Sequence, residues 1–278
     1  MWKKIVLVVA IMLLVAGLGL VLFPPISNWY GKQVSHDQSE SFGRALEHVV
    51  PADDDSGKGV PGVTEKTYAA ALEKKQIDEE GYPIDENGVR TGSTHVVFEL
   101  DLDRLYRDSV AYNEDLKVNQ GSKFIEGESH DNPALDLKRY GIYDNIYGYV
   151  SAPSIDMMLP IYLGASDRNM SYGAAHMTYS SLPLDGIDTN CAVVGHTGYI
   201  GRIFFDNIRR LEIGDTVSIR NYWENIDYEV IDYKVVTEEE TADIYIQKDR
   251  QLLTLITCIY AGSPDTFDRY LVICEKKK

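Results

Sequence analysis

The sequence predicts a mainly β protein, with a closed barrel in its C-terminal half, an apolar membrane helix at its N-terminus and a partly helical region between them. Beyond about residue 146, short apolar or alternating runs are separated by turn residues, a pattern typical of a barrel or sandwich rather than of βαβ units. Residues 5–23 contain no charged or strongly polar side chain, and nineteen such residues are close to the length that crosses a bilayer.

The apolar segment is interpreted as an uncleaved membrane anchor. Lys3 and Lys4 precede it and the first 36 residues contain no acid, so the positive-inside bias predicts residues 1–4 in the cytoplasm and the chain after Pro24 outside. Pro24 and Pro25 are expected to end the helix. The alternative is a cleaved secretory signal, whose apolar region is usually shorter and ends at small residues. Both interpretations export the rest of the chain.

The exported part is strongly acidic. Without Lys3 and Lys4, 25 basic side chains stand against 43 acidic ones, a net charge of about −18. Such a surface argues against nucleic acid as a partner, and a solvated ectodomain is its simplest explanation.

The region between the anchor and the β-rich half has mixed character. Residues 51–63 have the turn-forming composition of a loop, residues 65–76 are expected to form a helix, and residues 94–100 a short strand. Between residues 101 and 117, apolar side chains recur every three or four positions, which predicts an amphipathic helix.

Seven strands are expected in the second half, enough to favour a closed barrel. A short helix is expected over residues 204–210. The strands are predicted at residues 147–151, 159–163, 191–195, 216–220, 228–236, 252–257 and 270–274.

The three cysteines are Cys191, Cys258 and Cys274, an odd number without CxxC spacing, which argues against both a disulfide scaffold and a zinc site. A lone exported thiol is either a buried small hydrophobe or a nucleophile. Cys191 and Cys274 lie within apolar strands, where burial is the simplest account. The histidines other than His196 show no metal-ligand spacing and are taken as structural or solvated, so neither a metal nor a cofactor is predicted.

Three polar groups stand at strand ends. His196 follows an apolar strand in residues 191–198 (CAVVGHTG), Cys258 ends another in residues 254–258 (TLITC), and Arg269 begins a third in residues 268–273 (DRYLVI). A catalytic thiol needs a cationic or proton-accepting partner, and one barrel rim could bring all three together. Each residue alone also has an ordinary structural explanation.

Residues 148–275 resemble a sortase catalytic domain, most closely the class C, pilus-building branch. TLITC matches the family's TLxTC signature, Gly195-His196 its histidine segment, and Arg269 the arginine that follows the cysteine. Residues 159–164 (LPIYLG), His176 and residues 180–183 (SSLP) resemble the class C pattern between its first strands.

The resemblance implies an eight-stranded barrel, whose additional strand is expected near residues 174–178 or from a division of 228–236. It also implies transpeptidation of proteins that carry an LPxTG-like sorting signal in a Gram-positive envelope. Cys258 would be the nucleophile, His196 the proton donor and Arg269 the cationic partner, with Thr257 a candidate to assist the oxyanion site or simply a strand residue. The acceptor would be a pilin lysine or a cell-wall precursor amine. A secreted cysteine hydrolase and an inert envelope-binding module are the alternatives.

Class C sortases commonly carry a lid with an Asp-Pro-aromatic anchor. Here the nearest match is residues 131–134 (DNPA), so Asp131 and Pro133 are the lid candidates, against an ordinary Asp-Asn-Pro turn. Residues 112–116 (YNEDL) resemble the end of the pre-lid helix. The expected organisation is a cytoplasmic tail over 1–4, a membrane helix over 5–23, an extracytoplasmic N-terminal region over 24–145 and the catalytic barrel over 146–278. Residues 51–97 match nothing in the family and are interpreted as an insertion.

Overall fold

The computed structural model describes residues 2–47, 75, 78, 84–89, 101–125, 130–142, 144–199, 202–237, 240, 242–262 and 266–278, with the side chains of the first helix described as far as Val34. The loop expected over residues 51–63, the helix over 65–76 and the strand over 94–100 lie outside the described residues, apart from Lys75.

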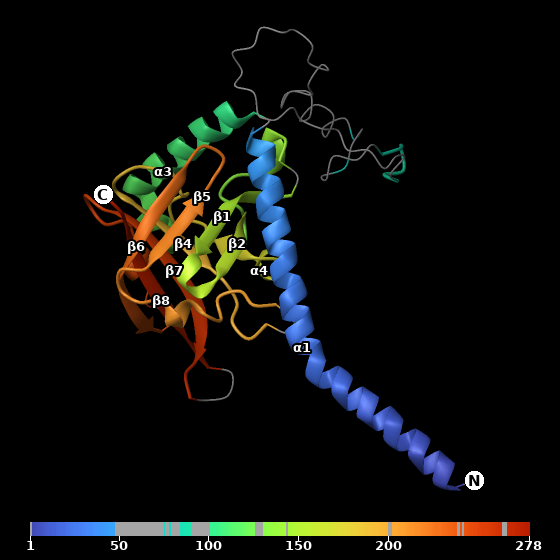
Figure 1. Ribbon diagram of the computed structural model, residues 1–278. Coiled ribbons are helices and arrows are strands. Elements are labelled where there is room, and N and C mark those ends of the chain that lie inside the picture. The colour runs from blue at the N-terminus through green and yellow to red at the C-terminus, as the bar shows by residue number, and fades with distance from the viewer. Residues whose placement is uncertain are drawn as a thin grey trace.

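Eight strands form the closed barrel that the sequence and its resemblance predict (Figure 1). Around the barrel they follow the order β1-β2-β3-β4-β7-β8-β6-β5, and β5 pairs antiparallel with β1 to close it. The additional strand is β3, inside the predicted 174–178 range, and β6 remains undivided. The strands are β1 (Ile146–Ala152), β2 (Met157–Leu163), β3 (Ala174–His176), β4 (Thr189–Val194), β5 (Thr216–Arg220), β6 (Asn225–Val236), β7 (Gln251–Tyr260) and β8 (Phe267–Lys276).

Alternation along the strands separates a barrel interior from an outer apolar layer. On β7, Leu255 belongs to the large core cluster, whereas Ile256 belongs to a second cluster with residues from β4, β8 and the β6–β7 connection. Successive side chains of a strand point to opposite faces, so Cys258 shares the outer face with Ile256. Cys191 and Cys274 belong to the inner cluster.

Helix α3 (Leu102–Ile125) packs beside the barrel (Figure 1). It begins where predicted, because the Asp101 carboxylate accepts a hydrogen bond of 2.9 Å from the Arg104 amide as an N-cap. It continues beyond residue 117 to Ile125. The Gln120 side chain explains the extra turns, since it donates to the Tyr179 carbonyl at 2.9 Å and accepts from the Ile246 amide at 2.8 Å.

Short helices lie before β1 and between the strands. They are η1 (Leu137–Tyr140), η2 (Pro153–Ile155), α4 (Asp167–Met170), η3 (Ile208–Arg210) and η4 (Ala242–Ile244). The helix expected over residues 204–210 is therefore shorter than predicted. Phe204 and Phe205 are almost completely buried in the barrel core instead, and the Asp206 carboxylate accepts from the Phe204 amide at 3.0 Å.

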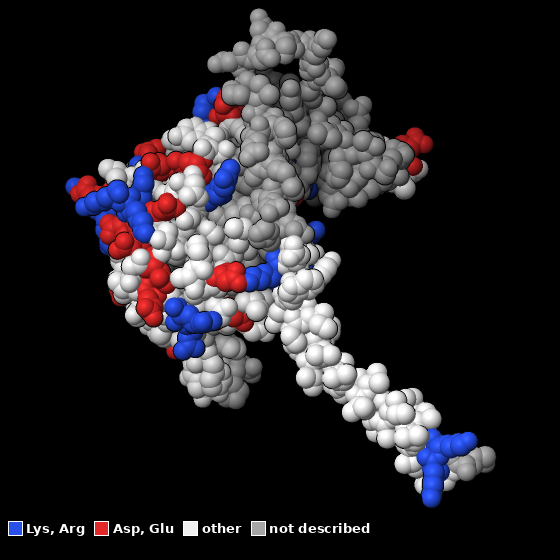
Figure 2. All heavy atoms as spheres, viewed as in Figure 1, with Lys and Arg blue, Asp and Glu red and all other residues white. Residues whose placement is uncertain are grey.

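Helix α1 (Trp2–Glu47) passes through Pro24 and Pro25, so the expectation that these prolines end the helix is wrong. Figure 1 shows the helix changing direction part-way along its length. A proline removes a backbone donor and crowds the preceding turn, which bends a helix without always ending it. The apolar N-terminal half is long enough to cross a membrane, none of it is buried against the protein, and positive charge marks its N-terminal end (Figure 2).

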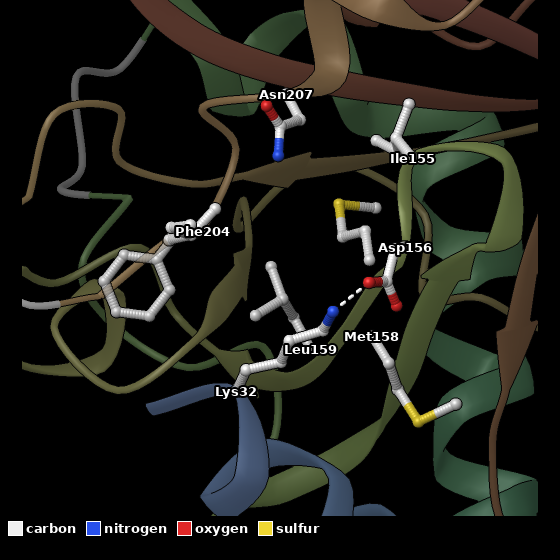
Figure 3. Close-up of a pocket in the computed structure, with 9 residues that line it drawn as sticks. Lys32, Ile155, Asp156, Met158, Leu159, Phe204 and Asn207 are labelled. Atoms are coloured by element: carbon white, nitrogen blue, oxygen red, sulfur yellow. Dashed lines mark hydrogen bonds and ion pairs between the residues drawn. The ribbon is translucent and has the colours of Figure 1, made fainter. Parts of the chain in front are cut away.

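Beyond the bend, α1 lies along β2 (Figure 1). Ser27, Asn28, Gly31 and Val34 are less exposed than the other residues of this segment, and their spacing places them on one helix face. Lys32 forms an ion pair with Asp156, the residue just before β2, at the edge of a small cavity of about 100 Å³ (Figure 3). Both partners are exposed, and exposed ion pairs stabilise little, so this pair adds little to the docking of α1.

Candidate active site

Cys258 and Arg269 face each other across the β7–β8 hairpin. They are directly opposite in the antiparallel register, each two residues from the hairpin end of its strand. Both side chains are half-buried and both line the same cavity. The hairpin therefore places the Cys258 thiol and the Arg269 guanidinium in the same cavity.

His196 reaches the same cavity from β4. This strand runs parallel to β7, with Val194 beside Ile256. The pairing continues past the end of β4, since the Gly195 amide donates to the Ile256 carbonyl at 3.0 Å. The next step along both chains brings His196 level with Cys258.

The turn at His196 is held from its inner side. A Cβ atom on Gly195 would lie 2.7 Å from the Phe205 ring, so a side chain there has no room. The Phe205 amide donates to the His196 carbonyl at 2.9 Å, and the imidazole stacks on Tyr199 with 5.6 Å between ring centroids. The backbone at His196 is thus held by Phe205, and the imidazole is stacked on Tyr199.

The three side chains share a cavity of about 440 Å³ on the outer face of the barrel. Its base comes from β4, β7 and β8, one wall from the β6–β7 connection, and the other from residues near α4 and β3. Apolar side chains dominate the lining, including Met170, Met177, Val194, Ile244, Ile256 and Leu271. A mostly apolar concavity with a few convergent polar groups is the usual form of a binding site.

Arg269 also supports the start of its own strand. Its Nη1 donates to the Phe267 carbonyl at 3.1 Å, which holds the guanidinium near the hairpin. Thr257 is almost completely buried, and its hydroxyl donates to the Gly195 carbonyl at 2.7 Å. The structure therefore shows Thr257 linking the cysteine strand to the histidine segment.

The candidate lid residues lie beside the cavity. Gly164 has a φ of +86°, and a Cβ atom on it would come within 2.4 Å of the Asp131 carbonyl oxygen, so the segment 130–133 presses on the chain after β2. Asp131 and Pro133 do not appear among the residues that line the cavity, but His130 does. Sequence reasoning took His130 as structural or solvated and missed its place at the site. Its position immediately before the lid candidates was the available signal.

The other two thiols and His176 are sealed in the interior. Burial raises the pKa of the Cys191 and Cys274 thiols well above the usual range. Burial also lowers the pKa of His176 to about 4, although its Nε2 lies 3.1 Å from the Ser180 carbonyl oxygen. Among the described residues, no three His, Cys, Asp or Glu side chains are grouped as a metal site would require.

Comparison with known proteins agrees with this architecture. The family model described as the sortase domain matches residues 150–277. Among curated proteins, sortase A of Bacillus anthracis is 25% identical over 153 residues, which cover 54% of this chain and 70% of that protein. Sortase A of Listeria monocytogenes is 27% identical over 166 residues, 58% of this chain and 72% of that protein.

Solved structures share the barrel. A pilus-related sortase C of Group B Streptococcus superposes with a TM-score of 0.54 at 28% identity, over 64% of this chain and 89% of that one. Sortase C from Clostridium perfringens SM101 gives a TM-score of 0.51 at 25% identity, over 77% of this chain and 99% of that one. With a matching family model, curated sortase relatives and class C structural neighbours, residues 150–277 are identified as a sortase domain.

Proposed function

We propose that this protein is a membrane-anchored sortase that cleaves an LPxTG-like sorting signal through a thioacyl intermediate and transfers the acyl group to an amine, in pilus assembly. The observation that supports it most is the convergence of Cys258, His196 and Arg269 on one apolar cavity. These three side chains supply a nucleophile, a proton carrier and a fixed positive charge, as amide transfer needs.

In the first half-reaction, the Cys258 thiolate attacks the carbonyl carbon between the signal's threonine and glycine. The carbon–nitrogen bond then breaks and His196 gives its proton to the departing amine, because an unprotonated amide nitrogen leaves poorly. The threonine carbonyl remains bonded to Cys258 as a thioester.

Arg269 stabilises the negative oxygen that develops in this step. A guanidinium keeps its charge at all working pH values and presents planar N–H donors. Its contact with Phe267 and its register partnership with Cys258 hold it near the thiol before substrate arrives. Preorganised donors of this kind are worth roughly 10²–10³ in kcat.

In the second half-reaction, an amine attacks the thioester, His196 accepts its proton and the Cys258 sulfur departs. We take a pilin lysine as the acceptor, because the solved neighbours include a pilus-related sortase C. The cell-wall precursor amine is the rival, and the curated relatives named sortase A are the reason to test it.

The membrane assignment rests on α1. Its apolar half has the length and composition of a membrane span, with lysines at the N-terminal end. We propose a cytoplasmic tail over residues 1–4, a span over 5–23, and an extracytoplasmic remainder in which 146–278 form the catalytic barrel.

The test uses the full chain in detergent or proteoliposomes with a fluorogenic LPxTG peptide. With a lysine-bearing pilin fragment present, ligated product should form; with a wall-precursor amine in its place, ligation should be slower. Cys258→Ala should form no thioester detectable by mass spectrometry, and His196→Ala should lose most activity.

Two results would overturn the proposal. One is full peptide cleavage by Cys258→Ala. The other is hydrolysed peptide as the product at every amine concentration, which would make the protein a cysteine hydrolase.

A further inference from the structure

The cavity contains polar side chains besides the three proposed to act in catalysis. The Thr257 hydroxyl already donates to the Gly195 carbonyl. Three further polar side chains come from the cavity walls, namely His130, Thr237 and Glu240. Thr237 and Glu240 are bonded to each other, since the Thr237 amide and hydroxyl both donate to Glu240 Oε2, at 2.8 Å and 3.2 Å. His130 is therefore the polar wall residue that is bonded to no other polar side chain of the described cavity lining, and the role of its ring nitrogens remains to be explained.

The His130 ring is fixed in one orientation. Its Nδ1 lies 3.0 Å from the Thr178 carbonyl oxygen, and a carbonyl can only accept, so Nδ1 carries a proton. The ring also packs against Phe124 and Tyr179, with centroid distances of 5.4 Å and 5.9 Å. With Nδ1 committed to the wall, Nε2 is the polar atom that His130 can offer to a molecule in the cavity.

The backbone around His130 is held as firmly as its ring. The Ala165 amide donates to the His130 carbonyl at 2.8 Å, and the Thr178 hydroxyl donates to the Asn132 carbonyl. These contacts join residues 130–132 to the chain on either side of β3, so the segment is built into the cavity wall. A group held this rigidly loses little entropy when it binds a ligand.

We propose that His130 is a specificity-determining residue that hydrogen-bonds the acyl-donor peptide through Nε2. This inference rests on the proposed function. An extended peptide in an apolar cavity buries backbone N–H and C=O groups, and each one left without a partner costs free energy of binding. The apolar lining receives the signal's leucine and proline, and His130 supplies a hydrogen bond on the same wall.

Two substitutions separate the roles of the ring nitrogens. Asparagine places its amide near the position of Nδ1, so His130→Asn keeps the bond to Thr178 and loses the Nε2 group. Glutamine reaches the position of Nε2, so His130→Gln keeps the group that faces the peptide and loses the bond to Thr178. His130→Phe removes both and retains the ring packing.

The experiment measures steady-state cleavage of the LPxTG peptide by the full chain, at a saturating amine concentration. His130→Asn and His130→Phe should raise KM about tenfold with kcat nearly unchanged, because the lost contact is made before and during the reaction alike, whereas His130→Gln should stay within about twofold of wild type. Peptide affinity measured by fluorescence anisotropy on the Cys258→Ala background should follow the same order. This second measurement does not depend on turnover, so it separates a wrong role for His130 from a wrong reaction.

Three outcomes would overturn the inference. If His130→Asn behaves as wild type and His130→Gln is impaired, the ring is only a structural tie to Thr178. If all three variants bind and cleave as wild type does, His130 contacts no substrate. If all three bind the peptide more tightly, the segment covers the site instead of recognising the signal.

Discussion

The Thr257 hydroxyl donates a hydrogen bond of 2.7 Å to the carbonyl of Gly195, and so joins the residue before the cysteine to the residue before the histidine. Both partners are buried. This bond couples the two strand ends that carry the proposed nucleophile and the proposed proton carrier, and its loss should affect stability and activity together.

Thr257→Val is expected to destabilise the protein by about 1–3 kcal/mol, because the buried Gly195 carbonyl loses its partner while the shape of the side chain is kept. Peptide cleavage should fall, since His196 is no longer held level with Cys258. Thr257→Ser retains the hydroxyl and should recover most of the activity. Urea unfolding and kcat/KM for the three proteins provide the measurement, and equal losses in Val and Ser variants would contradict the explanation.

Gly195→Ala should cost about 1–3 kcal/mol through overpacking, because the new Cβ would lie 2.7 Å from the Phe205 ring. The collision displaces the His196 turn, so kcat should fall more than KM changes. Combining it with Phe205→Leu makes room for the methyl group. In a double-mutant cycle, the pair should be less damaging than the sum of the single changes, and simple additivity would argue against the contact.

Thiol labelling should distinguish the three cysteines. In the folded protein at pH 8, iodoacetamide should modify Cys258 first, because Cys191 and Cys274 are buried and burial raises the pKa of their thiols. Mass spectrometry should find one label on the native chain, three after denaturation, and none on native Cys258→Ala. Comparable labelling of Cys191 in the folded state would show that the barrel interior is accessible.

His176 should make the protein sensitive to acid. Burial lowers its pKa to about 4, so the folded state keeps it neutral while the unfolded chain takes up a proton as the pH falls below about 6.5. Its contribution to stability is therefore present above pH 6.5 and is lost between pH 6.5 and 4, by about 3 kcal/mol in total.

The matched variant is His176→Gln, whose amide can still donate to the Ser180 carbonyl. Its free energy of unfolding should vary less with pH over this window than that of the wild type, as measured by urea titration at several pH values. Parallel curves for the two proteins would assign the acid sensitivity to other groups.

Much of the barrel could be predicted from the sequence because its strands alternate regularly. The same alternation indicates that Cys258 shares a face with Ile256 and that Cys191 and Cys274 point inward. β3 has three residues, too short for a periodic signal, and it was placed by family resemblance. The apolar segment from 5 to 23 was evident from composition. The continuation of α1 through Pro24 was not, because contacts with β2 support the helix beyond the prolines.

The site was predictable only in part. Cys258, His196 and Arg269 could be expected to meet because each stands at a strand end, and the register of β4, β7 and β8 now gives the reason. The contact between Thr257 and Gly195 depends on a parallel pairing that no local pattern reveals. His130 reaches the cavity because Gly164 lets a distant segment approach, and the only signal in the sequence was its place next to the lid candidates Asp131 and Pro133.

The docking of α1 on β2 also limits how far the barrel can move from the proposed membrane. If residues 5–23 cross a bilayer, as proposed, the rest of α1 is a rigid helical connection between the membrane and the barrel. The barrel then has a narrower range of positions than it would have on a random-coil linker. In Figure 1 the β7–β8 hairpin and the N-terminal half of α1 both extend toward the bottom of the view, so the hairpin lies at the end of the barrel nearer the proposed membrane. A barrel held in this position raises the effective concentration of the Cys258 thiol for substrate proteins that are still anchored in the membrane. It lowers that concentration for substrate proteins that have left the membrane.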